Sequence, residues 1–112
     1  MKKYFRLISN DDFSNVIKNG RTLKNASFVV HYLASSNNNL RIGITASTKL
    51  GNAVVRSTTR RRVRALCDEL ISNWEAKIDI VIIAKFEFLN KSYNDNRSLL
   101  NEIISSIPEL KK

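Results

Sequence analysis

Hydrophobic residues recur along the chain with two different periods, which predict where helices and strands form. Phe13, Val16 and Ile17 have the spacing of one helical face. Ser9 and Asp12, just before them, form a capping-box-like pair that can satisfy free backbone amides at a helix start. The pattern therefore predicts a short helix after residue 9.

Two segments in the first half of the chain have strand character. Residues 28–33 are rich in β-branched and aromatic side chains, and residues 40–47 alternate between apolar and polar positions. The intervening residues 35–39, Ser-Ser-Asn-Asn-Asn, are typical of a turn. We therefore expect the two strands to pair as a hairpin.

The second half of the chain predicts two helices separated by a strand. Asn52 is a suitable cap for a long helix over about residues 53–75. One apolar stripe runs along that helix, formed by Val63, Leu66, Cys67, Leu70 and Trp74. Residues 78–84 are nearly all apolar, as expected for a strand covered on both faces. Ser92 begins a second capping box, and the helix after it is expected to bury Leu99, Leu100, Ile103, Ile104 and Ile107.

The predicted order of elements is α-β-β-α-β-α. Neither a repeat nor a linker interrupts the 112 residues, so we expect a single domain over residues 1–112. The fold class is α+β, in the form of a two-layer sandwich of helices on a mostly antiparallel sheet.

The distribution of charge changes this picture from a generic domain to a candidate nucleic-acid-binding protein. The formal net charge is +9, and residues 13–67 contain ten basic side chains and no acidic one. A basic field confined to one contiguous part of a chain attracts polyanions, among which nucleic acid is the commonest. We therefore expect an RNA- or DNA-binding surface on this part of the chain.

The densest basic cluster lies near the start of the long helix. Its members are Arg56, Arg60, Arg61, Arg62 and Arg64. Guanidinium groups fit phosphate oxygens, whereas arginines on a merely solvated helix face usually alternate with glutamates one turn away. Lys49 and Asn52 stand beside the amides of the helix N-terminus, a second element that favours anions.

Catalytic and metal-binding patterns are weak in this sequence. One histidine and one cysteine cannot supply the roughly four ligands of a structural zinc site. We interpret His31 as a packed or groove-lining residue and Cys67 as a core residue. The longest apolar run, residues 80–84, is too short to span a membrane. We expect a cytoplasmic protein with no catalytic residue, no metal site and no membrane partner.

Residues 48–56, Thr-Lys-Leu-Gly-Asn-Ala-Val-Val-Arg, and the arginines after them resemble the bacterial ribonuclease P protein component. That family carries a basic helix behind a Lys-(Leu or Ile)-Gly-Asn-Ala-Val segment. Residues 40–44, Leu-Arg-Ile-Gly-Ile, and the apolar strand at residues 79–84 resemble it as well. The resemblance covers essentially the whole chain and implies an extra short strand and a left-handed βαβ crossover.

The resemblance also implies a function. The family forms a ribonucleoprotein that matures the 5′ end of precursor tRNA, in which the RNA subunit carries out the Mg²⁺-assisted hydrolysis. The protein would bind the catalytic RNA through Lys49, Asn52 and the arginine cluster, without a cofactor or obligate protein partner of its own. By position, Phe13, Ile17 and His31 would form the cleft for the single-stranded 5′ leader.

The chain departs from the family signature Arg-Asn-Arg-x-Lys-Arg-x-x-Arg at two positions, where Ser57 and Thr58 stand. Arg62 follows Thr58 by about one helical turn, so either it compensates for the missing basic residue or it is simply a solvent-facing member of the arginine run. The eroded signature leaves open a non-enzymatic ribosomal-type or regulatory RNA-binding protein. A DNA-binding helix-turn-helix protein is less favoured, because a strand follows the basic helix.

Overall fold

The computed structural model describes residues 4–35, 39–71 and 76–110. Five strands form one sheet: β1 (Phe5–Arg6), β2 (Arg21–Lys24), β3 (Phe28–Ala34), β4 (Arg41–Ala46) and β5 (Ile78–Ala84). Three α-helices accompany it: α1 (Asn10–Asn19), α2 (Ala53–Ile71) and α3 (Tyr93–Ser105). Two short 3-10 turns, Thr48–Leu50 and Phe86–Asn90, follow β4 and β5. The α+β class is therefore confirmed. β1 and β2 are additions to the order that the sequence pattern predicted, whereas the family resemblance implied one extra short strand.

The order of strands in the sheet is β1-β4-β5-β3-β2, so the predicted hairpin between β3 and β4 is wrong. The nearly continuous apolar strand β5 lies between them, antiparallel to β3 and parallel to β4. A strand buried on both faces needs a neighbour on each side, which places β5 at the centre of the sheet. The sheet is consequently mixed, with two parallel and two antiparallel pairs, rather than mostly antiparallel.

The hairpin in this part of the chain joins β2 to β3 instead. The Oδ1 atom of Asn25 accepts hydrogen bonds from the backbone N–H groups of Ser27 and Phe28, both at 3.1 Å. This side-chain-to-backbone pattern is the turn chemistry that favours asparagine. The predicted turn at residues 35–39 lies partly outside the described residues.

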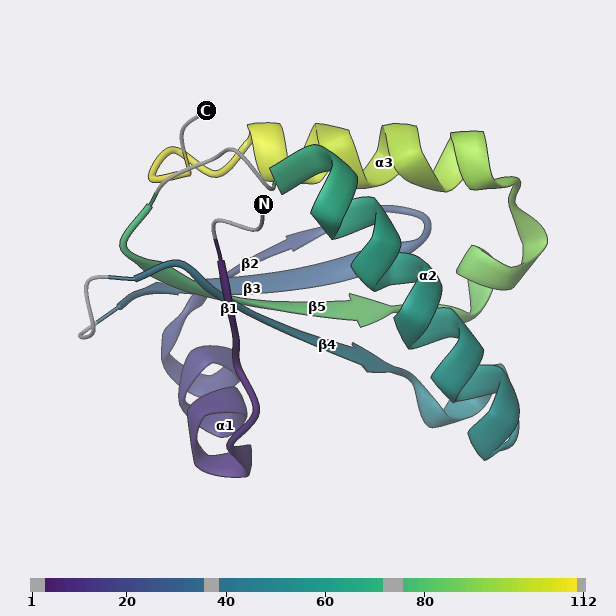
Figure 1. Ribbon diagram of the computed structural model, residues 1–112, viewed down its shortest axis with the longest axis horizontal. Coiled ribbons are helices and arrows are strands. Elements are labelled where there is room, and N and C mark those ends of the chain that lie inside the picture. Colours follow the sequence, from purple (N-terminus) through teal and green to yellow (C-terminus); the bar gives the residue numbers. More distant parts are fainter. Residues whose placement is uncertain (1–3, 36–38, 72–75, 111–112) are drawn as a thin grey trace.

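Helices cover the two faces of the sheet unequally. Figure 1 shows α2 and α3 on one face and α1 on the other. α2 connects the parallel neighbours β4 and β5, so the βαβ crossover is present. The hollows described below are lined by residues of α1, β4 and α2.

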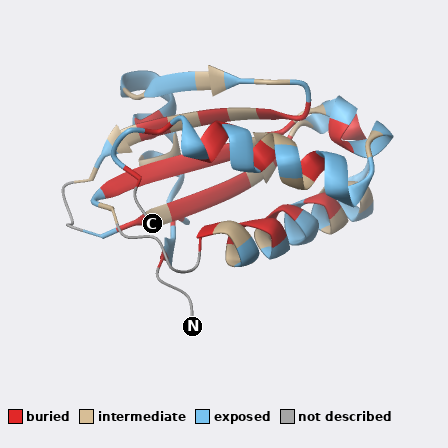
Figure 2. Ribbon diagram, turned by 90° about the horizontal axis from the view of Figure 1, so that it is seen from above, coloured by how far each residue is buried: buried red, intermediate tan, exposed pale blue. Residues whose placement is uncertain are grey.

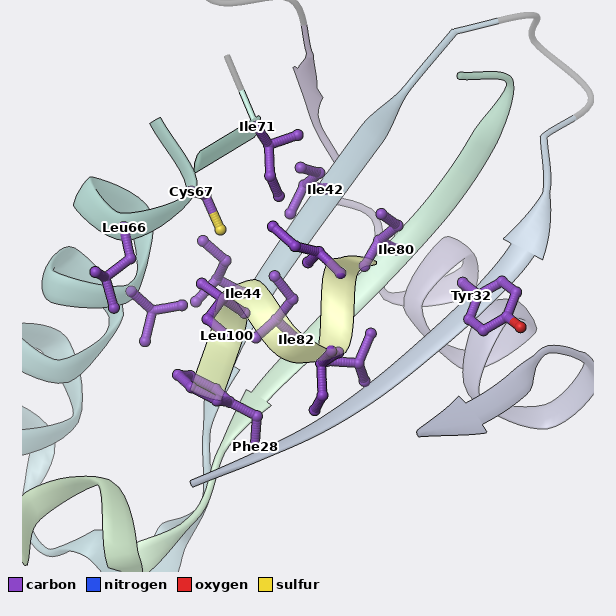
Figure 3. Close-up of a cluster of buried hydrophobic side chains, with 14 of the residues drawn as sticks. Phe28, Tyr32, Ile42, Ile44, Leu66, Cys67, Ile71, Ile80, Ile82 and Leu100 are labelled. Carbon is purple, nitrogen blue, oxygen red and sulfur yellow. The ribbon is translucent and has the colours of Figure 1, made fainter. Parts of the chain in front are cut away.

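The main core lies between the sheet and the helices α2 and α3. Buried residues run along the central strands, while both helices carry buried and exposed sides (Figure 2). Leu66, Cys67 and Ile71 of α2 are fully buried and point toward the isoleucines of β4 and β5 (Figure 3). A smaller cluster under α1 contains Val16 and Val81. The predicted core residue Trp74 lies outside the described residues.

Two of the three predicted helix caps are confirmed. The Oδ1 atom of Asn52 accepts from the Val55 amide, and the Ser92 hydroxyl accepts from the Asp95 amide, each at 3.1 Å. The predicted capping box at Ser9 is wrong, because the Ser9 side chain makes no cap hydrogen bond. The Asp12 carboxylate instead accepts a hydrogen bond from Arg41 on β4.

Candidate nucleic-acid interface

A hollow of about 470 Å³ lies beside α2, and we call it the arginine hollow. Segments far apart in the chain contribute to it: the first strand and the residues after it, the start of α1, β4 and α2. Its lining consists of Arg6, Leu7, Ile8, Phe13, Ile44, Ser57, Arg60, Arg61 and Arg64. The four arginines and the apolar floor combine positive charge with a surface on which a flat ring can lie.

A second hollow, of about 500 Å³, lies next to the first along α1, and we call it the α1 hollow. Its lining consists of Asn10, Phe13, Ser14, Ile17, Ile44, Thr45 and Arg60. Phe13, Ile44 and Arg60 line both hollows. The two hollows therefore meet at these three residues and form a continuous groove.

The polar residues of α2 lie on two flanks of the helix, and the arginines of one flank border the groove. Side chains on a helix are separated by about 100° per residue, so Ser57, Arg60, Arg61 and Arg64 share one flank. The buried stripe containing Thr59 separates this flank from the other. Arg56 precedes Arg60 by one turn and extends the same flank toward the helix N-terminus.

Arg62 lies on the opposite flank of α2. At about 100° per residue it shares that flank with Thr58 and Glu69, away from the arginine hollow. The expected proximity of Arg62 to Thr58 therefore holds on the helix, but the pair does not face the groove. The predicted arginine cluster is split by the structure into a groove-facing set and one outlying member.

Arg64 has an unusual environment within the groove. Its Nη1 atom is buried and has no hydrogen-bond partner among the described residues, although the residue as a whole is partly exposed. A buried guanidinium N–H without an acceptor is costly, and an anionic oxygen would satisfy it.

The neighbouring Cys67 is fully buried, and burial raises the pKa of its thiol to about 12. Cys67 is thus a neutral core residue, as predicted.

The N-terminus of α2 is built by a tight turn. Gly51 has a φ of 142°, a region that side-chain-bearing residues rarely adopt, and it allows the chain to turn into the helix. Lys49 is exposed in the preceding 3-10 turn. The side-chain Oδ1 atom of Asn52 accepts a hydrogen bond from the Val55 amide, so its described contact is structural.

The predicted cleft residues are brought together only in part. Phe13 and Ile17 line the α1 hollow, with 41% of Ile17 exposed. His31 lines neither hollow. It lies on β3 opposite Thr22, whose Oγ1 is 2.9 Å from the His31 Nδ1 atom, and beside Val81 on β5. Burial, and secondarily the charge of Lys24, lowers the pKa of His31 below its ordinary value of 6.5.

An ion-pair network anchors α1 to the sheet, and sequence patterns did not reveal it. Arg41 and Asp79 are cross-strand partners on β4 and β5, and the guanidinium donates to both carboxylate oxygens at 2.8 and 2.7 Å. The Arg41 Nη1 atom also donates to Asp12 of α1 at 3.2 Å. Asp79, the most buried of the three, holds the pKa of Arg41 above its ordinary value.

Arg6 is a further groove residue that sequence reasoning missed. It belongs to a two-residue strand that pairs in parallel with β4, where Arg6 is the partner of Ile42. A two-residue segment carries no recognisable periodicity, so its placement depends on a distant partner. The buried Tyr4 hydroxyl donates a hydrogen bond to Asp68, which fixes the same segment to α2. The one feature of the sequence that could have pointed to Arg6 as a groove residue is its positive charge.

The groove combines positive charge with apolar and aromatic side chains. Within the described ranges, no group of three or more His, Cys, Asp or Glu side chains is arranged to hold a metal ion. No helix in the described part of the chain is long and apolar enough to cross a membrane. Positive charge beside a half-buried aromatic ring that lines a groove is an arrangement that can bind single-stranded nucleic acid. The fold and groove thus define a small α+β nucleic-acid-binding domain.

Comparison with known proteins identifies the family. The family model described as Ribonuclease P matches residues 1–107. A ribonuclease P protein component from Listeria monocytogenes is 34% identical over 105 residues, covering 93% of this chain and 88% of the relative. One from Streptococcus pneumoniae is 38% identical over 85 residues, covering 76% and 69%. The chain belongs to the ribonuclease P protein family, so its function is RNA binding in tRNA processing.

Solved structures agree with this assignment. The ribonuclease P protein of Staphylococcus aureus superimposes with a TM-score of 0.82 at 28% identity, covering 96% of this chain and 98% of that one. The protein from Thermotoga maritima gives a TM-score of 0.76 at 28% identity, covering 91% and 96%. The family membership favours a ribonuclease P subunit over the alternative of a ribosomal-type or regulatory RNA-binding protein.

Proposed function

We propose that this chain is the protein subunit of a ribonuclease P holoenzyme whose RNA subunit carries out the phosphodiester hydrolysis. Its partners are that catalytic RNA and precursor tRNA, and its setting is the cytoplasm. The observation that carries this proposal is the groove shared by Phe13 and the arginines of α2, in a chain of the ribonuclease P family. Mg²⁺ acts through the RNA subunit, and the protein contributes binding energy and orientation.

In this proposal the groove-facing flank of α2 binds phosphates of the catalytic RNA. Arg60 and Arg61 are exposed and free to reach a phosphate, while Arg64 offers a buried N–H that lacks an acceptor. Arg56 and Lys49 extend the positive surface toward the helix N-terminus. Arginine forks bind phosphate oxygens through paired charge-assisted hydrogen bonds, which supports assigning this flank to the RNA backbone.

The same proposal assigns the 5′ leader of precursor tRNA to the groove floor at Phe13 and Ile17. A base can stack on the Phe13 ring while Arg60, which lines both hollows, neutralises a neighbouring phosphate. His31 lies on the same face of the sheet, and its lowered pKa makes it an uncharged ring at neutral pH. Any contribution of His31 is therefore stacking or hydrogen bonding rather than charge.

Reconstitution tests this function. The chain is combined with the ribonuclease P RNA of the same organism, and cleavage of precursor tRNA is followed at low magnesium. We expect the protein to raise the cleavage rate, and a variant with Arg60, Arg61 and Arg64 all replaced by Ala to lose the enhancement. Equal rates with and without the protein, or cleavage by the protein without RNA that survives nuclease controls, would contradict the proposal.

A further inference from the structure

Gly43 occupies the middle of β4, where glycine weakens a strand and commonly marks a close approach of another group. The group that approaches here is the ring of Phe13. A Cβ atom built on Gly43 would lie 2.4 Å from Cζ, 2.9 Å from Cε2 and 3.0 Å from Cε1 of that ring. Those are its three nearest neighbours, so the side chain that Gly43 makes room for belongs to α1.

The rest of β4 fixes the same turn of α1. On the strand face that carries Gly43, the preceding residue is Arg41, and its guanidinium donates to Asp12, the residue before Phe13. Arg41 is itself anchored by the bidentate pair with Asp79. This ion pair holds the start of α1 close to β4, and the Phe13 ring contacts the strand at Gly43.

The position of this ring determines the shape of the groove. Phe13 lines both hollows, so a displacement of its ring changes both at their junction. Ordinary contact between a Cβ atom and a ring carbon begins at about 3.4 Å, whereas Cζ would be at 2.4 Å. A methyl group at position 43 must therefore push the ring tip away by roughly 1 Å. The ring tip is the far end of a rotatable side chain, so the ring can move while the sheet stays paired.

We propose that Gly43 is a positioning residue that sets the depth of the Phe13 ring and thereby the affinity of the groove for a single-stranded leader. This inference rests on the proposed function of the groove. Gly43 itself touches no RNA, because it is buried beneath the ring. Because Gly43 has no side chain, the Phe13 ring can lie directly against β4 at this position.

The test is a double-variant cycle in the reconstituted holoenzyme. Affinity is measured for precursor tRNA with a leader of several nucleotides and for the same tRNA without a leader, using wild type, Gly43→Ala, Phe13→Ala and the double variant. We expect Gly43→Ala to weaken binding of the leader-bearing RNA about fivefold or more and to leave the leaderless RNA unchanged. In the Phe13→Ala background, Gly43→Ala should have no further effect.

Ile104→Val serves as the matched control, because Ile104 is fully buried in α3 on the other face of the sheet. It lowers stability without touching Phe13, so it should not alter the ratio of the two affinities. If Gly43→Ala fails to fold, the double variant should fold again, since the clash is with the Phe13 ring. A double variant that also fails to fold overturns the proposal.

The remaining outcomes separate the two claims. If Phe13→Ala weakens leader binding but Gly43→Ala does not, the positioning role is wrong and the proposed function of the groove stands. If neither variant affects the leader-bearing RNA, both the positioning role and the leader assignment are overturned. A Gly43→Ala effect that persists in the Phe13→Ala background also overturns the positioning role.

Discussion

His31 is the chain's one histidine, so its protonation is the main side-chain titration expected just below neutral pH. Its pKa in the folded protein is lowered, first by burial and then by Lys24. The unfolded chain therefore binds a proton more readily than the folded protein. The free energy of unfolding must then rise with pH across this interval.

We predict that the contribution of neutral His31 to the free energy of unfolding is fully present above about pH 6.5. This contribution is lost as the pH falls through the folded-state pKa of His31. Urea unfolding between about pH 5 and pH 8 measures this dependence. His31→Asn, which cannot be protonated, should flatten the curve in that interval. The same slope in His31→Asn, or greater stability at the acidic end, would show that another group is responsible.

The helix α2 has two sides with different roles. The flank with Arg60 lines the groove, whereas the flank with Arg62 faces away from it. The two arginines are both exposed, so they form a matched pair for substitution. Compensation by Arg62 for the basic residue missing at Thr58 would require RNA to extend over both flanks.

We expect Arg60→Leu to weaken binding of the catalytic RNA by about 1 kcal/mol or more, the scale of a charge-assisted hydrogen bond. Arg62→Leu should cost clearly less. Filter binding at one fixed salt concentration compares the two variants. A loss at Arg62 as large as that at Arg60, restored by Thr58→Arg, would instead establish compensation on the outer flank.

The elements that sequence patterns predicted well are those whose structure is decided locally. Asn52 and Ser92 cap their helices as expected, because an N-cap depends on side chains two or three residues away. Ser9 makes no cap hydrogen bond, and the side chain of Asp12, its predicted capping-box partner, pairs with the distant Arg41 instead. The β3–β4 hairpin failed for the same reason, since a strand more than thirty residues later inserts between them.

At the candidate site, the sequence predicted which charged residues take part, and the structure shows how they are arranged. The arginines of α2 and the ring of Phe13 were identified from residue type and family resemblance. Arg6 and Gly43 were not, since their importance follows from the pairing of β1 with β4 and from the seating of α1 on that strand. Helical spacing alone also did not indicate which flank of α2 borders the groove.

At the scale of the whole molecule, the net charge of +9 is concentrated in residues 13–67, which carry ten basic side chains and no acid. Part of this charge borders one groove, where Arg6 joins the arginines of α2. RNA binding at such a surface releases condensed counterions, and each phosphate contact adds to the dependence on salt. The number of phosphates in contact is therefore measurable without a structure of the complex.

The salt dependence of the affinity for the catalytic RNA tests the central claim most directly, namely that this arginine-lined groove binds RNA through phosphates. We predict that log K falls linearly with log salt, with a slope of magnitude about 3 to 6. Arg60→Leu should reduce that magnitude by about 1. A slope near zero between moderate and high salt would contradict the account.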